Sequence, residues 1–184
     1  MILITPSRWL GDLVKESFLK NYPVEVRHNT VDRNVFKPTP SDFRERYGIG
    51  KRFMILGVAS PWTERKGLSD FVRLASELDD RYAIILVGLS KKQIKALPEH
   101  IIGFERTSSP QELAGIYSAA DLFFNPTRED NFPTVNLEAV ACGTFVITYN
   151  TGGCCETVHS SLGLSVEGLS EALAEIRKRK CTED

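Results

Sequence analysis

The sequence predicts an α/β protein built on a doubly wound parallel sheet. Apolar runs of strand length alternate with helical patterns along almost the whole chain. The runs are apolar on both sides, and most are followed by Gly, Pro, Ser or Asn, which is typical of strands buried inside a parallel sheet. Because such alternation indicates right-handed βαβ units, we expect helices on both faces of one sheet.

The first fifty residues follow a different plan. We expect a strand, a helix opened by Ser7 and a second strand: Ile2 to Thr5, Trp9 to Leu19 and Val24 to Arg27. A polar segment from Asn29 to Asn34 and a Pro-Thr-Pro stretch come next, and a Pro-bounded polar segment resembles a connection between domains. We therefore predict that residues 1–22 form an appendage or part of a neighbouring unit, and that residues 23–184 form the main domain.

The main domain is expected to contain the following elements in chain order. The strands are Phe53 to Val58, Tyr82 to Val87, Ile101 to Phe104, Asp121 to Phe124 and Thr144 to Tyr149. The helices are Leu68 to Leu78, Lys91 to Leu97, Gln111 to Ala119, Pro133 to Cys142 and Ser170 to Arg179. Pro133 suits the first turn of its helix, and Gly143 stands where a left-handed C-cap is expected.

Composition narrows the class of protein. With 184 residues, 42% of them hydrophobic and 26% charged, the chain is long enough for one well-buried domain and a fragment of a second. A net charge of -1 gives no reason to expect nucleic-acid binding. The apolar runs are too short to cross a bilayer, and the first residues lack a secretory signal. The four cysteines show no framework spacing, so we expect reduced thiols in a cytoplasmic protein.

The segment from Glu129 to Gly143 holds the most informative chemistry. It leads from acidic residues into a helix, so Asp130 and Glu138 lie beside the free N–H groups of a helix N-terminus. Such N–H groups bind phosphate, while carboxylates accept hydrogen bonds from sugar hydroxyls. The segment therefore favours a ligand that is part phosphate and part sugar.

Other loops at the carboxyl ends of predicted strands carry suitable residues, and ligands bind there in doubly wound sheets. Arg65 and Lys66 precede a helix start and can meet a phosphate, although a solvated basic pair is an equal alternative. Gly152 and Gly153 can form an anion-binding nest, although a plain turn also explains them. The absence of a Walker signature and of G-x-G-x-x-G counts against a P-loop NTPase or a dinucleotide dehydrogenase.

At this point the residues resemble a known family. The stretch from Asp130 to Gly143 is similar to the acidic motif of retaining GT-B glycosyltransferases of family 4 (group 1), in which two acids separated by seven residues lead into a helix with an Ala-Cys-Gly end. The first acid of that motif is usually Glu, and Asp130 takes its place here. Further matches follow in the family's order: Thr5 to Trp9, Asn29 to Asp32, Phe36 to Pro38, Lys66-Gly67, Tyr117 to Asp121, Pro126, and Gly152-Gly153 with Glu156.

The resemblance implies a Rossmann-like domain that is one half of a GT-B enzyme with a short N-terminal appendage. Residues 1–22 would be the last strand and helix of the N-terminal acceptor domain, and residues 23–184 would be the donor sugar-nucleotide-binding domain. The missing acceptor domain would be a partner, and any peripheral membrane contact would run through that absent half. The chain alone would transfer no sugar.

The resemblance also assigns roles to residues. Glu138 would bind the donor ribose, Asp130 the transferred sugar and Lys66 the leaving diphosphate. Phosphate would further meet main-chain groups around four residues of the helix start and two glycines: Phe132, Pro133, Thr134, Val135, Gly152 and Gly153. The family's arginine after the first strand is replaced by Ala59-Ser60, so Ser60 lines that position and Arg65 is a candidate substitute. The implied donor is a nucleotide-diphosphate sugar, with no cofactor and no metal.

Three alternatives remain beside the transferase, for which we expect a glycan acceptor and retention of configuration. The first is a non-catalytic nucleotide-sugar-binding module with a regulatory or scaffolding role. The second is a sugar-nucleotide epimerase of the GT-B type, which the Asn29 to Asp32 segment and the acidic motif fit less well. The third is a generic α/β fold with an accidental acidic helix. The base and the sugar of the donor leave no recognisable side-chain pattern.

Overall fold

Six apolar segments form one parallel sheet in the computed structural model, which describes residues 1–159 and 161–183. The strands are β3 (Phe53–Val58), β4 (Tyr82–Val87), β5 (Ile101–Phe104), β6 (Leu122–Asn125), β7 (Phe145–Tyr149) and β8 (Gly163–Val166). Their order across the sheet is β5-β4-β3-β6-β7-β8, and every pair is parallel. The chain builds outward from β3 and then returns to place β6 on its other side. The loops after β3 and β6 therefore diverge, and ligands bind at such a point in doubly wound sheets.

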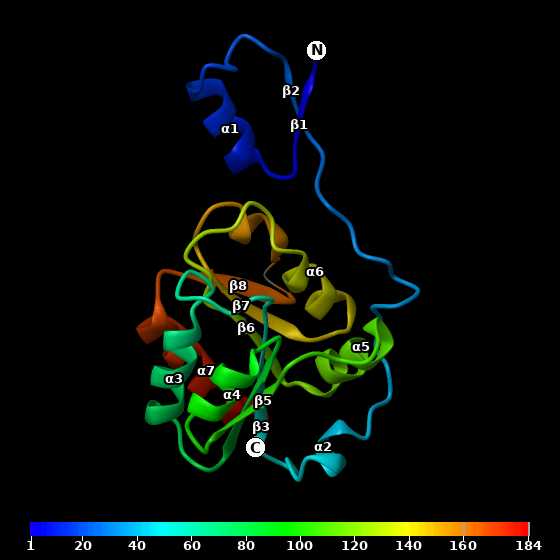
Figure 1. Ribbon diagram of the computed structural model, residues 1–184, viewed down its shortest axis with the longest axis vertical. Coiled ribbons are helices and arrows are strands. Elements are labelled where there is room, and N and C mark those ends of the chain that lie inside the picture. The colour runs from blue at the N-terminus through cyan, green and yellow to red at the C-terminus, as the bar shows by residue number, and fades with distance from the viewer. Residues whose placement is uncertain (160, 184) are drawn as a thin grey trace.

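Helices cover both faces of this sheet (Figure 1). One face carries α3 (Leu68–Glu77), α4 (Lys91–Ala96) and α7 (Leu169–Glu183). The other carries α2 (Phe43–Arg46), α5 (Pro110–Ala119) and α6 (Thr134–Ala141). Strand β3 illustrates how both faces of the sheet are buried. Ile55 packs against the layer of α3, α4 and α7, and Leu56 packs against the layer of α2, α5 and α6; neither side chain is exposed to solvent. Alternate side chains of one apolar strand thus serve two separate cores.

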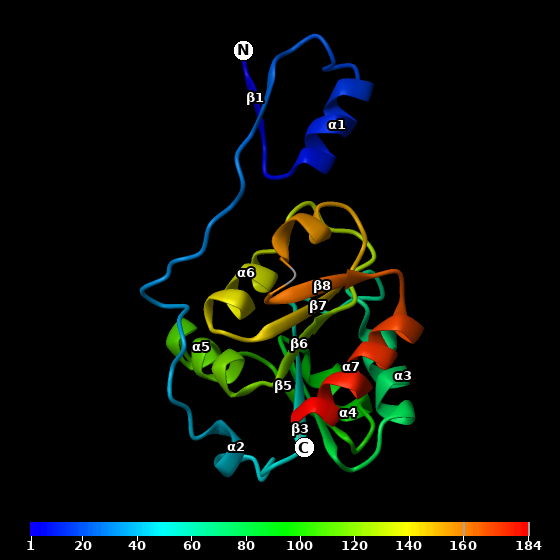
Figure 2. The ribbon, with the colours of Figure 1, turned by 180° about the vertical axis from the view of Figure 1, so that it is seen from behind.

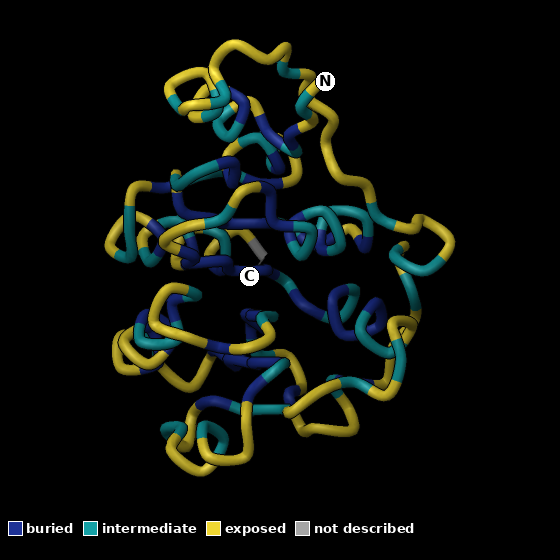
Figure 3. The backbone as a smooth tube through the Cα atoms, turned by 45° about the horizontal axis from the view of Figure 1, so that its top comes forward, coloured by how far each residue is buried: buried dark blue, intermediate teal, exposed yellow. Residues whose placement is uncertain are grey.

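A small unit precedes the main domain. It consists of β1 (Leu3–Thr5), α1 (Arg8–Glu16) and β2 (Val24–Val26), and its two strands form a separate parallel sheet. Figures 1 and 2 show this unit beyond one end of the main sheet, with an extended connector that runs past α5 to α2. In Figure 3 most of its backbone is exposed, whereas the strands of the main sheet are buried.

The predicted fold class is confirmed, and β3, β4 and β5 have the predicted bounds. Ser7 caps α1 as predicted, and its hydroxyl accepts the N–H of Leu10 at 3.1 Å. Helix α1 ends at Glu16, before the expected Leu19, because Ser17 adopts an extended backbone and bonds back to Val14. Gly143 has the predicted left-handed conformation, with a φ of 86°.

Three elements were not predicted: α2, strand β8 and a 3₁₀ turn, η1 (Cys154–Thr157). Strand β8 is a sheet edge with a mixed Gly-Leu-Ser-Val sequence, so its pairing with β7 rather than its own apolar content defines it. A domain boundary at residue 22 stays a prediction. Strand β2 lies beyond that boundary, and it pairs with β1 instead of joining the main sheet.

The sequence analysis also made predictions about the cysteines and about membrane-spanning segments. Cys142 and Cys154 are buried, Cys155 and Cys181 are exposed, and all four are free thiols. No described helix has the length and apolar character needed to cross a bilayer.

Candidate functional site

A pocket of about 230 Å³ lies at the point where the loops after β3 and β6 diverge. The loop after β3, the loop after β6 and the start of α6 form its walls. It contains most of the site residues predicted from sequence: Ser60, Lys66, Asp130, Phe132, Pro133, Thr134 and Val135. Val58, Ala59 and Asn125 complete the lining. The fold thus gathers residues that lie up to 77 positions apart in sequence, from Val58 to Val135.

The central feature of the pocket is an ion pair between Lys66 and Asp130. The Lys66 ammonium lies 2.6 Å from Asp130 Oδ2, and the two side chains are only 24% and 18% exposed. The other carboxylate oxygen, Oδ1, accepts the backbone N–H of Phe132 at 3.2 Å. Reduced exposure weakens solvent screening, so this pair interacts more strongly than an ion pair on the open surface.

The loop that carries Lys66 is held against the loop that carries Asp130. Gly67 has a φ of 79°, and a Cβ there would come within 2.4 Å of the carbonyl oxygen of Pro126. Only glycine permits this close approach in this conformation. The N–H of Arg128 donates to the carbonyl of Arg65 at 2.8 Å, which ties the two loops together one residue from Lys66.

The Arg128 side chain adds a second tie between these loops. Its guanidinium donates to the carbonyl oxygen of Glu64 and lies 3.1 Å from Oδ2 of Asp70. Asp70 is 3% exposed, and Tyr149 donates a hydrogen bond to it at 3.0 Å. Burial, followed by the neighbouring Asp70 charge, raises the pKa of Tyr149 well above its ordinary value. The phenol therefore stays protonated and serves as a donor to the buried carboxylate.

Arg65 does not enter the pocket. Its guanidinium donates to the backbone carbonyl of Glu129 at 3.3 Å, and the residue is absent from the lining. The hypothesis that Arg65 replaces the family's missing arginine finds no support in this arrangement. The sequence could not show which of Arg65 and Lys66 enters the pocket. Adjacent side chains in a turn point in different directions, and those directions depend on the path of the loop.

The start of α6 presents free N–H groups to the pocket, as predicted. Pro133 occupies the N-cap position rather than the first helical position, and no side chain caps the helix. In the part of the chain that the structure describes, the N–H groups of Thr134 and Val135 have no hydrogen-bond partner. These groups and the positive end of the helix dipole favour an anion at this position.

Glu138 lies one turn beyond the pocket lining, on the same side of α6 as Val135. Its Oε2 accepts a hydrogen bond of 3.0 Å from the hydroxyl of Tyr117. Burial raises the pKa of Glu138 above its ordinary value, and the bond from Tyr117 partly offsets this effect. Burial also raises the pKa of Tyr117, so the hydroxyl remains a donor.

Gly152 and Gly153 pack against the backbone of the acidic loop, which is the segment from Glu129 to Phe132 after β6. A Cβ on Gly152 would come within 2.1 Å of the carbonyl oxygen of Asp130, and one on Gly153 within 1.9 Å of that of Asn131. The N–H of Gly153 donates to the Asp130 carbonyl at 3.0 Å. This N–H is therefore engaged within the protein and does not point at a ligand as an anion nest requires. Both glycines allow a close backbone contact.

The small unit contacts the same loops. Both carboxylate oxygens of Glu156 accept backbone N–H groups at the start of α1, from Arg8 at 2.9 Å and from Trp9 at 3.0 Å. At the start of the connector, just after β2, the ring of His28 stacks on Phe132, with centroids 4.8 Å apart and planes inclined by 14°. Sequence patterns could not reveal these contacts, because the partners lie more than 100 residues apart.

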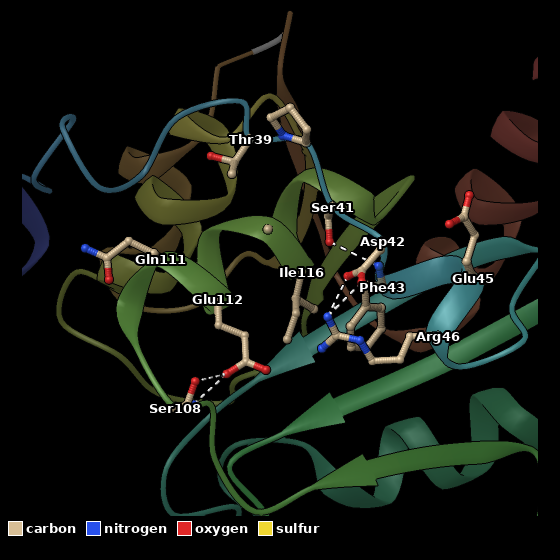
Figure 4. Close-up of a pocket in the computed structure, with 12 residues that line it drawn as sticks. Thr39, Ser41, Asp42, Phe43, Glu45, Arg46, Ser108, Gln111, Glu112 and Ile116 are labelled. Carbon is tan, nitrogen blue, oxygen red and sulfur yellow. Dashed lines mark hydrogen bonds and ion pairs between the residues drawn. The ribbon is translucent and has the colours of Figure 1, made fainter.

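A larger hollow, of about 680 Å³, lies between the connector and α5 (Figure 4). Three of its charged groups already have partners: Asp42 pairs with Arg46, and Glu112 accepts hydrogen bonds from Ser108. None of the predicted site residues lines it. The smaller pocket is the better candidate because it combines a cation, a carboxylate and a free helix N-terminus at the switch point of the sheet.

Comparison with known proteins gives a consistent result. The family model described as "Glycosyl transferases group 1" matches residues 51–179, which include the whole main sheet and the pocket. The GDP-mannose-dependent alpha-(1-6)-phosphatidylinositol monomannoside mannosyltransferase of Mycolicibacterium smegmatis is 33% identical over 184 residues, which cover 88% of this chain and 48% of that protein. The chain spans about half the length of the curated relatives it matches.

Solved structures share the fold. The Anabaena protein HepE in complex with UDP-glucose aligns with a TM-score of 0.76 and 22% identity, covering 96% of this chain and 53% of that one. The C-terminal domain of a glycosyl transferase group 1 family protein (LpcC) from Francisella tularensis aligns with a TM-score of 0.62 and 16% identity, covering 80% of this chain and 86% of that one.

Proposed function

This chain belongs to the glycosyl transferases group 1 family, and from that premise we propose that it is the donor-binding domain of a glycosyltransferase. The enzyme would move a sugar from a nucleotide-diphosphate sugar to an acceptor, with retention of configuration. The observation that carries the proposal is the Lys66–Asp130 pair beside the free N-terminus of α6. This arrangement offers a cation and N–H groups to a diphosphate and a carboxylate to a sugar.

The chemistry of the reaction explains why these groups belong together. Cleavage of the bond between the sugar and the diphosphate leaves negative charge on a phosphate oxygen. Lys66 and the N–H groups of Thr134 and Val135 lie together in a partly buried pocket, where they would stabilise this charge. HepE in complex with UDP-glucose, which shares the fold, supports a nucleotide-sugar ligand. No cofactor or metal is part of the proposal.

Donor binding would change the partner of Lys66. Without ligand, the ammonium pairs with Asp130. A diphosphate attracts the ammonium more strongly than one carboxylate does, because it carries more negative charge. Asp130 would then accept hydrogen bonds from the hydroxyls of the transferred sugar, while Glu138 would bind the ribose. The pocket and the neighbouring Glu138 would thereby recognise both halves of the donor.

The acceptor half would lie outside this chain. Thr5 faces α1, so Ile2 and Ile4 lie on the opposite face of the small sheet, where they are 63% and 58% exposed. A strand that is apolar on this open face fits an interior strand of a larger sheet. We propose that the small unit is the end of an N-terminal acceptor domain in a cytoplasmic enzyme with a glycan acceptor, and that this absent half makes any peripheral membrane contact.

Thermal-shift screening of UDP-, GDP- and ADP-sugars tests the proposal directly. A ligand at 100 times its dissociation constant stabilises the folded state by about 2.7 kcal/mol. Lys66→Met should abolish the shift, whereas Lys91→Met, at an exposed lysine on α4, should preserve it. If none of these donors stabilises the chain, the proposal fails. Robust transfer from a radiolabelled donor by the isolated chain would contradict the need for an acceptor half.

One observation favours a second candidate, a non-catalytic nucleotide-sugar-binding module. Ala59-Ser60 occupies the position of the family's arginine, and Arg65 donates to the Glu129 carbonyl and is absent from the lining, so Lys66 is the single cation among the described lining residues. Glu138→Gln separates the two candidates in a polypeptide that also contains the acceptor domain. Loss of turnover supports the transferase, and unchanged cellular function supports the module.

A further inference from the structure

Tyr117 is built to hold one side chain in place. It lies on α5 with no exposure to solvent, and its ring makes edge contacts with Phe36 and Phe123 at centroid distances of 6.3 and 5.4 Å. Its carbonyl accepts the hydroxyl of Thr144 at 2.6 Å. The backbone and the ring of Tyr117 are thus both held in place, so the position of the phenol oxygen is fixed. That hydroxyl donates to Oε2 of Glu138.

The Glu138 carboxylate has a second oxygen that this contact leaves available. Within residues 1–159 and 161–183, Tyr117 is the one hydrogen-bond partner of this carboxylate. Glu138 shares its side of α6 with Val135, which lines the pocket. A long, flexible carboxylate side chain otherwise loses rotamer freedom when it binds a ligand. A bond to an immobile phenol removes that freedom before the ligand arrives.

We propose that Tyr117 is a positioning residue for the donor: it holds Oε2 of Glu138 so that Oε1 accepts the ribose hydroxyls of a nucleoside diphosphate. This inference rests on the proposed function, since it assumes that Glu138 meets the ribose. It assigns a role to a buried residue that touches no ligand. Pre-organisation of the acceptor is the physical effect, and its consequence is affinity for ribonucleotides.

Protonation gives the contact a second consequence. Glu138 must be ionised to accept two ribose hydroxyls, and burial opposes ionisation. The titratable groups that face it are Tyr117 from α5 and Cys142 at the end of its own helix. Because the Tyr117 hydrogen bond lowers the pKa of Glu138, removal of the hydroxyl raises that pKa. Ribonucleotide binding should then weaken at a higher pH than in the native chain.

A cycle of two proteins and two ligands tests the inference. The full chain and its Tyr117→Phe variant are titrated calorimetrically with whichever of UDP, GDP and ADP binds, and with the matching 2′,3′-dideoxynucleoside diphosphate. A hydrogen bond to a charged group is worth about 1.5 kcal/mol or more, so Tyr117→Phe should weaken ribonucleotide binding roughly tenfold. Dideoxynucleotide affinity should stay the same in both proteins, because neither hydroxyl is present.

The control is Tyr82→Phe, which removes the hydroxyl of another buried tyrosine, in β4, far from α6 in the sequence. It should leave both affinities and their pH dependence unchanged. Equal losses for ribo- and dideoxynucleotides in Tyr117→Phe, or no loss at all, overturn the inference. If the native chain binds no nucleoside diphosphate, the proposed function itself fails, which is a separate outcome.

A second variant covers the case in which Tyr117→Phe does not fold. Tyr117→4-aminophenylalanine keeps the shape and offers a weaker donor. The ratio of ribonucleotide to dideoxynucleotide affinity should then fall below the native ratio. The pH below which ribonucleotide binding weakens should also rise. An unchanged ratio overturns the inference.

Discussion

The carboxylate of Glu156 accepts a hydrogen bond of 2.9 Å from the backbone N–H of Arg8, across 148 positions of sequence. The bond joins the main domain to the first turn of α1, and the second carboxylate oxygen binds Trp9 in the same way. Glu156 lies in η1, three residues after Gly153, whose backbone contacts the loop that carries Asp130. Glu156 therefore connects the small unit to the segment whose glycines contact the Asp130 loop of the candidate pocket.

Glu156→Ala should release the small unit from the main domain. A carboxylate that satisfies helix N-terminal N–H groups contributes about 1 kcal/mol, and its loss leaves those of Arg8 and Trp9 unpaired. We expect faster hydrogen exchange at these two amides and a change in Trp9 fluorescence. The exposed Glu16 provides the matched control, since Glu16→Ala removes a charge without this contact. Equal exchange rates in both variants would refute the connection.

Asp130→Asn should separate recognition of the diphosphate from recognition of the sugar. It frees Lys66 from its ion pair, so a nucleoside diphosphate should bind several-fold more tightly. A nucleotide sugar should gain little or lose affinity, because the amide replaces an ionised acceptor. Calorimetry with both ligands measures the difference. The neighbouring Glu129 is exposed, and Glu129→Gln should change neither affinity; weaker diphosphate binding by Asp130→Asn would contradict the exchange of partners.

Arg128→Met should destabilise the domain more than an ordinary surface substitution does. It leaves Asp70, a carboxylate that is 3% exposed, without its cation and cuts one tie between the two pocket loops. Asp70 is buried but Arg128 is 42% exposed, so we expect a loss of about 1–2 kcal/mol, between those of an exposed and a fully buried ion pair. Urea unfolding should show this loss, together with weaker nucleotide binding. Arg73→Met, at an exposed position of the same helix as Asp70, should cost less than about 0.5 kcal/mol.

Glu138→Gln should stabilise the chain near neutral pH. The ordinary pKa of a glutamate is about 4.5, and burial raises that of Glu138 in the folded state. A group whose folded pKa is raised contributes stability below its unfolded pKa and loses it as pH rises through the folded value. The native chain should therefore lose stability through this window, and the glutamine variant should not. Unfolding midpoints between pH 4 and 8 measure the difference, and parallel curves would contradict the burial effect.

Gly152→Ala should distort the acidic loop. The residue has a φ of 54°, and a Cβ would meet the Asp130 carbonyl oxygen at 2.1 Å, which neither atom can avoid without moving the backbone. We expect a loss of stability above about 1 kcal/mol and a larger loss of donor affinity. Gly168→Ala is the control, because a Cβ there meets nothing within 4 Å. If both variants bind the donor equally well, the bracing role is wrong.

Much of the site was predictable because its residues occupy fixed places along a repeating pattern. Each strand ends at a known edge of a parallel sheet, so Lys66 after β3 and Asp130 after β6 had to lie near each other. The direction of a side chain within a loop follows no such pattern. The sequence therefore predicted Arg65 at the pocket, but its guanidinium bonds to the Glu129 carbonyl instead. Arg128, which the sequence analysis did not single out, joins the two loops by bonding to the Glu64 carbonyl.

The sequence by itself determined the doubly wound fold, the edge of the sheet that holds the site and the helix start that faces it. These follow from local periodicity and from the residues that end each element. Tertiary structure alone decided which oxygen of Glu138 is held by Tyr117, that Gly153 donates within the protein, and that Glu156 reaches Arg8. Hydrogen bonds of this kind depend on loop paths and side-chain rotamers, which only the packing of distant segments fixes.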